Sequence, residues 1–335
     1  MSLVKKISVM VLFLASFQTA YANWVKQESN TLSWLHDIYF VSENKGFIAG
    51  SGGTLLTTND GGKTWTKEKN FTTDTIRQIY FSDANTGWLL CERNIFNLGA
   101  NSPSYLLKTT DGGANWAQIN FGGGRSRIAK IFFAKNGFGL AVGESGALFA
   151  LQDDARTWKK NLSPIRYLML DGVFTDDFHG AMVGGGGTIM FTEDAGLSWN
   201  QATVFGDGRA KLNSVFFINQ KIGWTVGANG KIYQTINGGK IWREQISNVS
   251  NNLSDIFFNS TAEGWAVGDD GTILHTTTAG NVWTLENSKV RHRLEKVFFV
   301  GKKGFAVGFG GTILSYDENV KNNPQIKPTF KSQIN

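Results

Sequence analysis

Four arginines occupy one position of a repeated pattern, and they are the clearest candidates for binding chemistry in this sequence. Each lies seven residues before an aromatic or apolar pair such as Phe132-Phe133. Other basic residues lie five or three positions before the same pair. The candidate partner-binding residues are Arg77, Arg125, Arg127, Arg166, Arg209, Lys211, Arg291 and Arg293.

The chemistry that this set offers is recognition of anions. A guanidinium presents a rigid fork of donors that matches a carboxylate or a phosphate. Seven of the ten arginines in the chain belong to the set. We predict that they attract an acidic protein surface. The alternative is that these loops are simply polar and carry arginine as a solvated residue.

The residue patterns of common enzyme classes are absent from the sequence. A glycosidase needs two carboxylates across a cleft, and no acidic pair has a distinctive context. Gly62-Lys63-Thr64 lacks the upstream glycine of a phosphate-binding loop. The four histidines show no metal-ligand spacing. We therefore predict no enzymatic activity, no catalytic residues, no metal and no cofactor.

The strands that position the arginines belong to a repeated sequence pattern, of which Gly264–Trp283, GWAVGDDGTILHTTTAGNVW, is one copy. Each repeat begins with an apolar and aromatic run, which suits an innermost strand buried on both faces. Two shorter strands follow, separated by a glycine turn, and a fourth strand carries a tryptophan. The seven initial runs are LHDIYF, IRQIYF, IAKIFF, MLDGVF, LNSVFF, LSDIFF and LEKVFF.

Four short strands repeated about every 42 residues indicate an all-β fold, a β-propeller. The last repeat, from Leu294, has no fourth strand, and the segment beginning Asn23-Trp24 resembles an unpaired fourth strand. We predict a seven-bladed propeller over residues 23–316 that the N-terminal strand closes as the outer strand of the last blade. An open solenoid is the alternative, and it would need polar caps at both ends.

Propeller geometry places the candidate residues on one face. Each lies in or near the connection from a fourth strand to the next first strand, and these connections share a face with the turns between second and third strands. An insertion between the second and third strands of the second repeat, Cys91 to Ser104, belongs to the same face. We predict an arginine-rich face there, opposite the turns that precede the tryptophans.

The turns before the tryptophans follow the Asp-box pattern S/T-x-D-x-G-x-T-W, as in Thr58–Trp65. Scattered and partly degraded copies, with Asn237 and Thr278 at the Asp position, indicate a structural role. These repeats resemble bacterial neuraminidase repeats, and the phrase FF…GWAVG..GTIL.T.DGG..W resembles the photosystem II stability/assembly factor family over about Trp24 to Tyr316. The resemblance implies a seven-bladed propeller without enzymatic activity that holds membrane-protein intermediates through an arginine-rich face.

The ends of the chain predict export. Lys5 and Lys6, an apolar run and Ala20-Tyr21-Ala22 form a signal peptide over residues 1–22. Residues 317–335 are expected to be a poorly ordered tail. No cysteine stands at the cleavage site, whereas cyanobacterial members of the resembling family are typically lipoproteins. We expect a periplasmic, soluble monomer.

Charge and the single cysteine narrow the class further. Without Lys5 and Lys6 the formal net charge of +6 becomes +4, which does not indicate a nucleic-acid partner. Cys91 has no cysteine to pair with. The predicted function is binding of a protein partner, such as a subunit of a membrane-protein complex, for scaffolding or assembly. The alternative is a carbohydrate-active propeller, either a sialidase-like glycosidase or a lectin.

Overall fold

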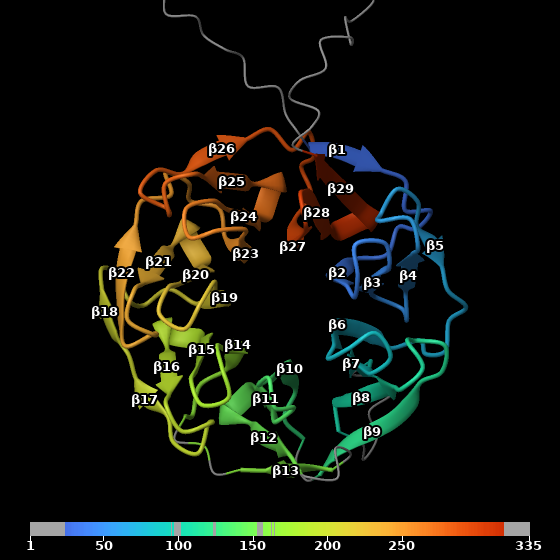
Figure 1. Cartoon of the computed structure of the whole chain (residues 1–335), viewed down its shortest axis with the longest axis horizontal. Helices are drawn as coiled ribbons and strands as arrows, with labels where there is room; N and C mark the ends of the chain where they lie inside the picture. The colour runs from blue at the N-terminus through green and yellow to red at the C-terminus, as the bar shows by residue number, and fades with distance from the viewer. Residues whose placement is uncertain are drawn as a thin grey trace, which may run out of the picture.

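A ring of β-sheets around a central axis makes up the structure, a computed structural model (Figure 1). It describes residues 24–317, apart from residues 95, 97–101, 123–124, 153–156, 162 and 164. The predicted signal peptide and residues 318–335 lie outside the described residues. Within the described part, no helix has the length and apolar character needed to cross a membrane.

The strands fall into four-stranded antiparallel groups, which we call blades 1 to 7 in the order of their innermost strands. Blade 1 comprises β2 (Leu35–Phe40), β3 (Gly46–Gly50), β4 (Leu55–Thr58) and β5 (Thr66–Lys67). Blade 2 comprises β6 (Thr75–Phe81), β7 (Gly87–Glu92), β8 (Ser104–Thr109) and β9 (Ala117–Gly122). Blade 3 comprises β10 (Ile128–Phe133), β11 (Gly139–Gly143), β12 (Leu148–Leu151) and β13 (Trp158–Lys160). The ends of the predicted insertion, Cys91 and Ser104, are thus parts of β7 and β8.

Blades 4 to 7 repeat this order and end with a strand from the other end of the described chain. Blade 4 comprises β14 (Met169–Phe174), β15 (Gly180–Gly184), β16 (Ile189–Thr192) and β17 (Asn200–Gln201), and blade 5 comprises β19 (Leu212–Phe217), β20 (Gly223–Gly227), β21 (Ile232–Thr235) and β22 (Ile241–Gln245). Blade 6 comprises β23 (Leu253–Phe258), β24 (Gly264–Gly268), β25 (Ile273–Thr276) and β26 (Thr284–Glu286). Blade 7 comprises β27 (Leu294–Val300), β28 (Lys303–Gly308), β29 (Thr312–Asp317) and β1 (Trp24–Gln27).

Two parallel pairings add to this plan. β13 pairs with the end of β9, which joins blades 2 and 3 into one eight-stranded sheet. β18 (Thr203–Phe205) leaves the outer strand of blade 4 and pairs with β22, so it becomes a fifth strand of blade 5. The chain between blades 4 and 5 therefore takes a longer path along the rim than a direct connection would.

Closure by the N-terminal strand is confirmed. β1 pairs antiparallel with β29, from Trp24 opposite Tyr316 to Gln27 opposite Ile313. The Trp24 ring is fully buried, and its Nε1 donates a hydrogen bond of 2.7 Å to Glu286 Oε2 of blade 6. A strand edge that an open chain would expose is thereby paired, and the closing strand is also tied to the neighbouring blade.

Aromatic rings packed across glycines hold neighbouring blades together. A phenylalanine at or near the end of each innermost strand lies against a glycine at or near the start of the second strand, as Phe40 does at Gly46, where a Cβ would collide with the ring. Several of these rings stack on a second-strand ring of the preceding blade, as Phe81 does on Phe47 with centroids 4.9 Å apart. Such stacking accounts for the repeated pairing of phenylalanine with glycine in the sequence.

The Asp-box turns are structural. In blade 1, Asp60 Oδ1 accepts hydrogen bonds from the backbone N–H groups of Lys63 and Thr64, and Asp60 Oδ2 accepts one of 2.6 Å from Thr64 Oγ1. These bonds, first among them those from Thr64, lower the pKa of the Asp60 carboxyl. Where another residue replaces the aspartate, the position four residues later, which is Thr64 in blade 1, is replaced as well and carries an apolar residue. Asn237 is followed in this way by Ile241, and Thr278 by Val282. The predicted copy at Asp153 lies outside the described residues.

Backbone hydrogen bonds define the two faces. The short 3₁₀ turns between second and third strands, such as η2 (Glu144–Gly146), bond to the residue before the same blade's innermost strand, as Glu144 N–H does to the Arg127 carbonyl. We call this side the connection face. The other turns of this kind are η3 (Gly185–Gly187), η4 (Ala228–Gly230), η5 (Asp269–Gly271) and η6 (Phe309–Gly311). Asp-box turns bond instead to the turns between first and second strands, on the opposite face.

Candidate functional site

The innermost strands surround the axis (Figure 1). Each contains a β-bulge near its start. A bulge inserts one unpaired residue and re-aims the neighbouring side chains. The bulged residue and the one after it are polar in most blades. These runs are largely buried, as expected, but the third residue adds a polar side chain that is buried in five of the seven blades and meets other polar groups around the axis.

These third residues form an axial polar belt: Asp37, Gln78, Lys130, Asp171, Ser214, Asp255 and Lys296. Four of these side chains hydrogen-bond to the backbone of the next blade, namely those of Asp37, Gln78, Asp171 and Asp255. Asp37 Oδ2 accepts from Ile79 N–H at 2.8 Å, and Asp255 Oδ2 accepts from Val297 N–H at 3.0 Å. These backbone groups lie beside the bulges, where the strand ladder leaves donors to be satisfied, so the belt joins neighbouring blades.

The belt balances buried charges. Lys130 Nζ lies 2.8 Å from Asp171 Oδ1, and Lys296 Nζ lies 3.0 Å from Asp255 Oδ1. Burial raises the pKa of Asp171, but Lys130 and Lys296 outweigh it and the net shift is downward. Burial dominates for Asp37, so its pKa is raised despite the same lysines. With each lysine in an ion pair, the belt is suited to holding the ring together.

Three of the predicted arginines are held in ion pairs at the mouth of the axis on the connection face. Arg77 Nε lies 2.7 Å from Glu92 Oε2, and Arg127 bridges Glu92 at 3.3 Å and Glu144 at 3.0 Å. Across the mouth, Arg293 Nε lies 3.2 Å from Glu295 Oε1. These guanidiniums already have carboxylate partners within the chain.

An aromatic cluster lies beside this network, where blades 7 and 1 meet. The Trp34 ring contacts His36 and Phe309, with centroids 5.2 and 5.5 Å away, and the centroid of the His292 ring lies 5.9 Å from that of Phe309. Burial, Arg77 and Arg293 lower the pKa of His36 to about 3. A neutral imidazole at physiological pH follows, so His36 acts as part of an aromatic surface rather than as a cation.

The remaining predicted residues are exposed and have no ion pair among the described residues: Arg125, Arg166, Arg209, Lys211 and Arg291. The first three precede the innermost strands of consecutive blades, 3, 4 and 5. We call Arg125, Arg166, Arg209 and Lys211 the basic arc. Arg291 stands apart on blade 7, because Ser250 occupies the corresponding position of blade 6. The structure thus divides the predicted set into paired and unpaired cations.

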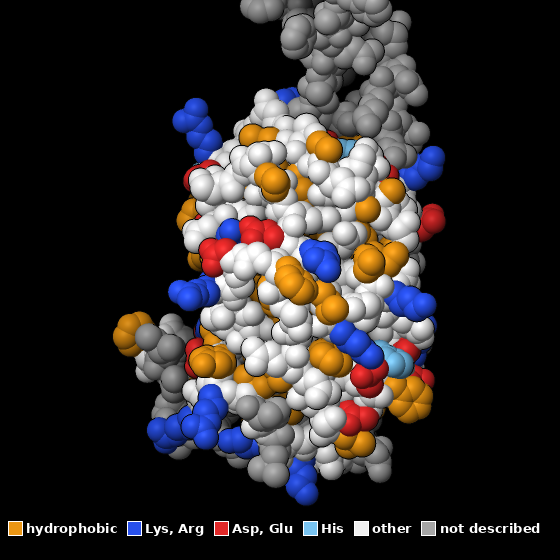
Figure 2. Space-filling view, turned by 90° about the vertical axis from the view of Figure 1, so that its left-hand side faces the viewer, with side chains coloured by type: hydrophobic (Ala, Val, Ile, Leu, Met, Phe, Trp, Pro, Cys, Tyr) orange, Lys and Arg blue, Asp and Glu red, His pale blue; other side chains and the backbone are white. Residues whose placement is uncertain are grey.

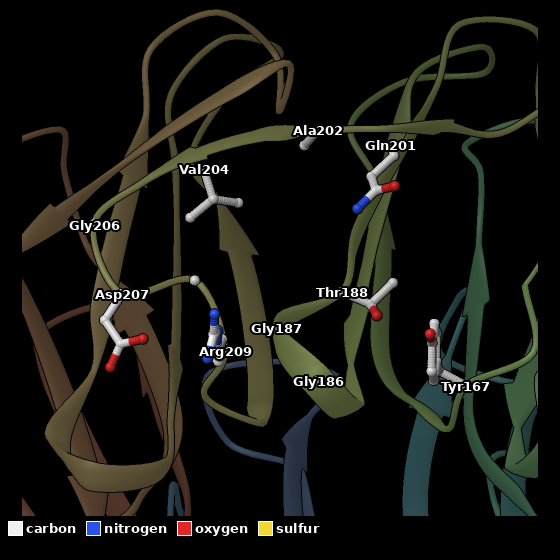
Figure 3. A pocket seen from close by; sticks show the side chains of 11 residues that line it. Tyr167, Gly186, Gly187, Thr188, Gln201, Ala202, Val204, Gly206, Asp207 and Arg209 are labelled. Atoms are coloured by element: carbon white, nitrogen blue, oxygen red, sulfur yellow. The ribbon is translucent and has the colours of Figure 1, made fainter.

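A cleft of about 730 Å³ opens within the basic arc, at the outer part of blade 4. In Figure 3, Val204, Gln201, Thr188 and Arg209 surround one open space, with Asp207 toward one end and Tyr167 toward the other. Elsewhere on this rim, hydrophobic side chains are scattered between Lys and Arg side chains (Figure 2).

The cleft exists because blade 4 lacks a side chain that other blades have. In blades 1, 3, 5, 6 and 7, the glycine that ends the turn between second and third strands packs beneath the carbonyl of Thr72, Ile165, Val249, Val290 or Thr31. In blade 4, Gly187 packs beneath the carbonyl of Gly208 instead. The valines and isoleucine pack into the hydrophobic clusters beside them, whereas Gly208 contributes no side chain.

The wall of the cleft that contains Asp207 is held in place by hydrogen bonds to blade 5. Glu244 Oε2 accepts a 2.9 Å hydrogen bond from the Asp207 N–H, and the Tyr233 hydroxyl donates to the Asp207 carbonyl. Lys231 Nζ lies 2.6 Å from Glu244 Oε1. The segment at Asp207 is therefore tied to blade 5, and the cleft remains open between the two blades.

Sequence reasoning missed both the belt and the cleft. The belt had a signal, since the third residue of each initial run is polar or charged within a mostly apolar segment. The cleft had a weaker one, the glycine-rich connection Gly206-Asp207-Gly208. No group of His, Cys, Asp and Glu in the described part of the chain has the arrangement of a metal site.

Comparison with known proteins identifies relatives. The family model described as Photosynthesis system II assembly factor YCF48 matches residues 17–163, 152–246, 209–287 and 237–328. A photosystem II assembly protein Ycf48 from Synechococcus sp. (strain JA-3-3Ab) is 29% identical over 33% of this chain and 34% of its own length. A photosystem II assembly lipoprotein Ycf48 from Synechococcus sp. (strain CC9902) is 32% identical over 31% and 32%. The chain thus aligns with about a third of each relative's length.

Solved structures support the fold. A structure described as YCF48 bound to D1 peptide superimposes with a TM-score of 0.73 and 22% identity, over 89% of this chain and 96% of that one. YCF48 from Cyanidioschyzon merolae gives 0.70 and 18%, over 89% and 100%. A virginiamycin B lyase from Staphylococcus aureus gives 0.72 and 13%, over 87% and 98%. An enzyme and assembly factors therefore share this propeller fold.

Proposed function

Because this chain belongs to the family of the photosystem II assembly factor YCF48, we propose that it is a non-enzymatic propeller that binds an acidic segment of a membrane-protein subunit during assembly. The observation that carries the proposal is the basic arc, where cations on three consecutive blades have no carboxylate partner among the described residues. A related propeller is described with a bound D1 peptide, which supports a peptide as the class of ligand.

The division into paired and unpaired arginines supports the unpaired ones as the binding residues. A carboxylate that approaches Arg127 competes with Glu92 and Glu144, which lie within 3.3 Å. Arg125 and Arg166 have no such competitor within the part of the chain that the structure describes. A hydrogen bond to a charged group is worth about 1.5–3 kcal/mol, and two such contacts at the low end weaken binding roughly 100-fold when they are lost.

A charge-reversal experiment tests the proposal. The triple variant Arg125→Glu, Arg166→Glu and Arg209→Glu is compared with the wild type for binding of a fluorescein-labelled glutamate-rich peptide, measured by anisotropy. The same peptide with glutamine in place of glutamate reports the contribution of charge. We expect the triple variant to bind the glutamate peptide at least 100-fold more weakly, with an unchanged melting temperature.

A matched control reverses three lysines on the opposite face. Lys63, Lys135 and Lys221 are exposed, lie in or beside the Asp-box and adjoining turns, and have no ion pair among the described residues. Their reversal to Glu changes the net charge by the same amount. Equal loss of binding in both triple variants would show attraction to overall charge and would refute a site on the connection face. Co-purification from host membranes then identifies the partner.

The proposal includes export to the periplasm, for which the predicted signal peptide over residues 1–22 is the support. N-terminal sequencing of the protein recovered from the host tests it, and a mature chain that begins at Asn23 is the expected result. Retention of Met1 on the recovered protein would contradict export by this route.

Carbohydrate binding is the second candidate, and the aromatic cluster of Trp34, His292 and Phe309 favours it. The adjacent carboxylates of Glu295 and Asp269 both lie within 3.6 Å of Arg293. Burial raises the pKa of Glu295. Hydrolysis of chromogenic glycosides that is lost in Glu295→Gln would replace the non-enzymatic proposal with this one.

A further inference from the structure

The cleft of blade 4 differs from the rest of the connection face because it lies among unpaired cations and is also partly apolar. Ala202, Val204 and the ring of Tyr167 line it together with the backbone of Gly186 and Gly187. Tyr167 is 63% exposed, so its ring is accessible to a ligand in the cleft. Arg209 belongs to both the cleft and the basic arc.

The cleft therefore combines apolar surface with positive and negative side chains at different places on its rim. Arg209 lines the space, and Arg166 is the chain neighbour of Tyr167 at one end (Figure 3). Asp207 lines the other end, where its side chain is 65% exposed and its nearest ammonium, Lys231 Nζ, is 3.9 Å away. Carboxylates of a ligand are attracted toward Arg166 and Arg209 and are repelled by Asp207, which lies on the Arg209 side of the space in Figure 3.

We propose that this cleft anchors a large apolar side chain, such as phenylalanine, of the acidic peptide segment, while neighbouring carboxylates of the segment bind Arg166 and Arg209. The inference rests on the proposed function and adds the residue type that the segment must contain. A volume of about 730 Å³ lies within the range of about 300–1,000 Å³ that is typical of ligand sites.

The absence of a side chain at Gly208 indicates which kind of ligand group fits the cleft. Ile165, Val249 and Val290 show that an aliphatic side chain suits the equivalent place in other blades. Gly208 leaves that place empty, next to the cluster formed by Val183, Ile189 and Trp242. An apolar side chain supplied by a partner would restore this packing and remove apolar surface from water.

The substitution Gly208→Val tests the cleft directly. Gly208 has no left-handed backbone conformation, and a Cβ there would meet Val204 at ordinary contact distance, so the variant is expected to fold. It supplies from within the chain the kind of side chain that Val249 supplies in blade 5. Ser250→Val is the control, because it adds the same side chain to an exposed position of the same face outside the cleft.

The probes are two fluorescein-labelled peptides that differ in one residue, with phenylalanine or alanine between two glutamates. Wild type and Ser250→Val are expected to bind the phenylalanine peptide about tenfold more tightly, as burial of one large apolar side chain allows. Gly208→Val is expected to bind both peptides at the affinity of the alanine peptide. Equal binding of the two peptides by the wild type would overturn the proposal.

The outcomes separate this inference from the proposed function. If reversal of the basic arc leaves peptide binding intact, the proposed function fails. If reversal abolishes binding but Gly208→Val keeps the tenfold preference, only the anchoring cleft fails.

A second measurement does not depend on the folding of any variant. Benzoylphenylalanine in place of phenylalanine is cross-linked to the wild-type protein, and the attachment site is mapped by mass spectrometry. Attachment to Tyr167, Val204 or their immediate neighbours supports the cleft. Attachment only at Trp34 or Phe309 places the apolar residue at the other aromatic surface and overturns the proposal.

Discussion

Asp255 should be among the costliest single residues to truncate, because it joins three blades at the axis. Its Oδ2 accepts the Val297 N–H at 3.0 Å, and its Oδ1 accepts the Ser214 hydroxyl at 2.7 Å and pairs with Lys296 Nζ at 3.0 Å. The carboxylate is buried. Asp255→Ala removes all three contacts and leaves an empty space in a polar interior.

The magnitude follows from what the truncation leaves behind. An unsatisfied buried N–H costs about 1–3 kcal/mol, and breaking a buried ion pair costs about 3–5 kcal/mol. About a quarter of the Lys296 side chain remains accessible to water, and Asp37 and Asp171 also act on its charge. We therefore expect a loss of about 3 kcal/mol in the free energy of unfolding, at the low end of that range.

Equilibrium urea unfolding, followed by tryptophan fluorescence and checked for reversibility, measures this loss. Asp255→Asn is the matched variant, since it keeps the shape and an acceptor for Val297 but replaces the other carboxylate oxygen with an uncharged NH2 group, so its loss should be smaller. Lys296→Met and the double variant with Asp255→Ala complete a cycle, in which we expect the double variant to be less destabilised than the sum of the two single variants.

Two results would refute this account of the belt. A loss below about 1 kcal/mol for Asp255→Ala would show that water or a neighbouring group replaces the carboxylate at little cost. Additive single variants would show that Lys296 and Asp255 do not act together despite their 3.0 Å separation.

Two further predictions concern closure and pH. Trp24→Ala empties a fully buried site where the first and last strands meet, so we expect a loss of about 3–5 kcal/mol in the free energy of unfolding, whereas Val25→Ala, at an exposed position of the same strand, should change it by less than about 0.5 kcal/mol. The pKa of Asp171 is lowered in the folded state, so its stabilising contribution is present above the ordinary aspartate pKa of about 3.9 and is lost as the pH falls through the folded value. Asp171→Asn should therefore reduce the fall of the urea midpoint in acid, and an unchanged pH profile would contradict the assigned shift.

Much of the fold could be predicted because each blade repeats a local pattern. Gly264, the β-branched residues after it and Trp283 mark turns and strands whose conformations depend on neighbouring residues in the chain. The unpaired fourth strand at Trp24 was also readable, since it is the only complement to the incomplete last repeat. Closure then follows from pairing of exposed edges.

The face that carries the candidate cations was predictable from the sequence, but which of them form ion pairs was not. Sequence spacing placed Arg77, Arg127 and Arg293 on the same face as Arg166, and the hydrogen bonds of the connections agree with that placement. Their ion pairs with Glu92, Glu144 and Glu295 depend on side chains from different strands and blades. No spacing rule separates a paired guanidinium from an unpaired one.

The sequence by itself determined the repeat, the all-β propeller, the closing strand and the face that carries the arginines, because each of these depends on local periodicity and on the need to pair strand edges. Only the tertiary structure decided which cations remain available, how the axial belt is satisfied and where a cleft opens. Those features depend on distances between blades and on one missing side chain, at Gly208, whose effect appears only when the neighbouring blade is in place.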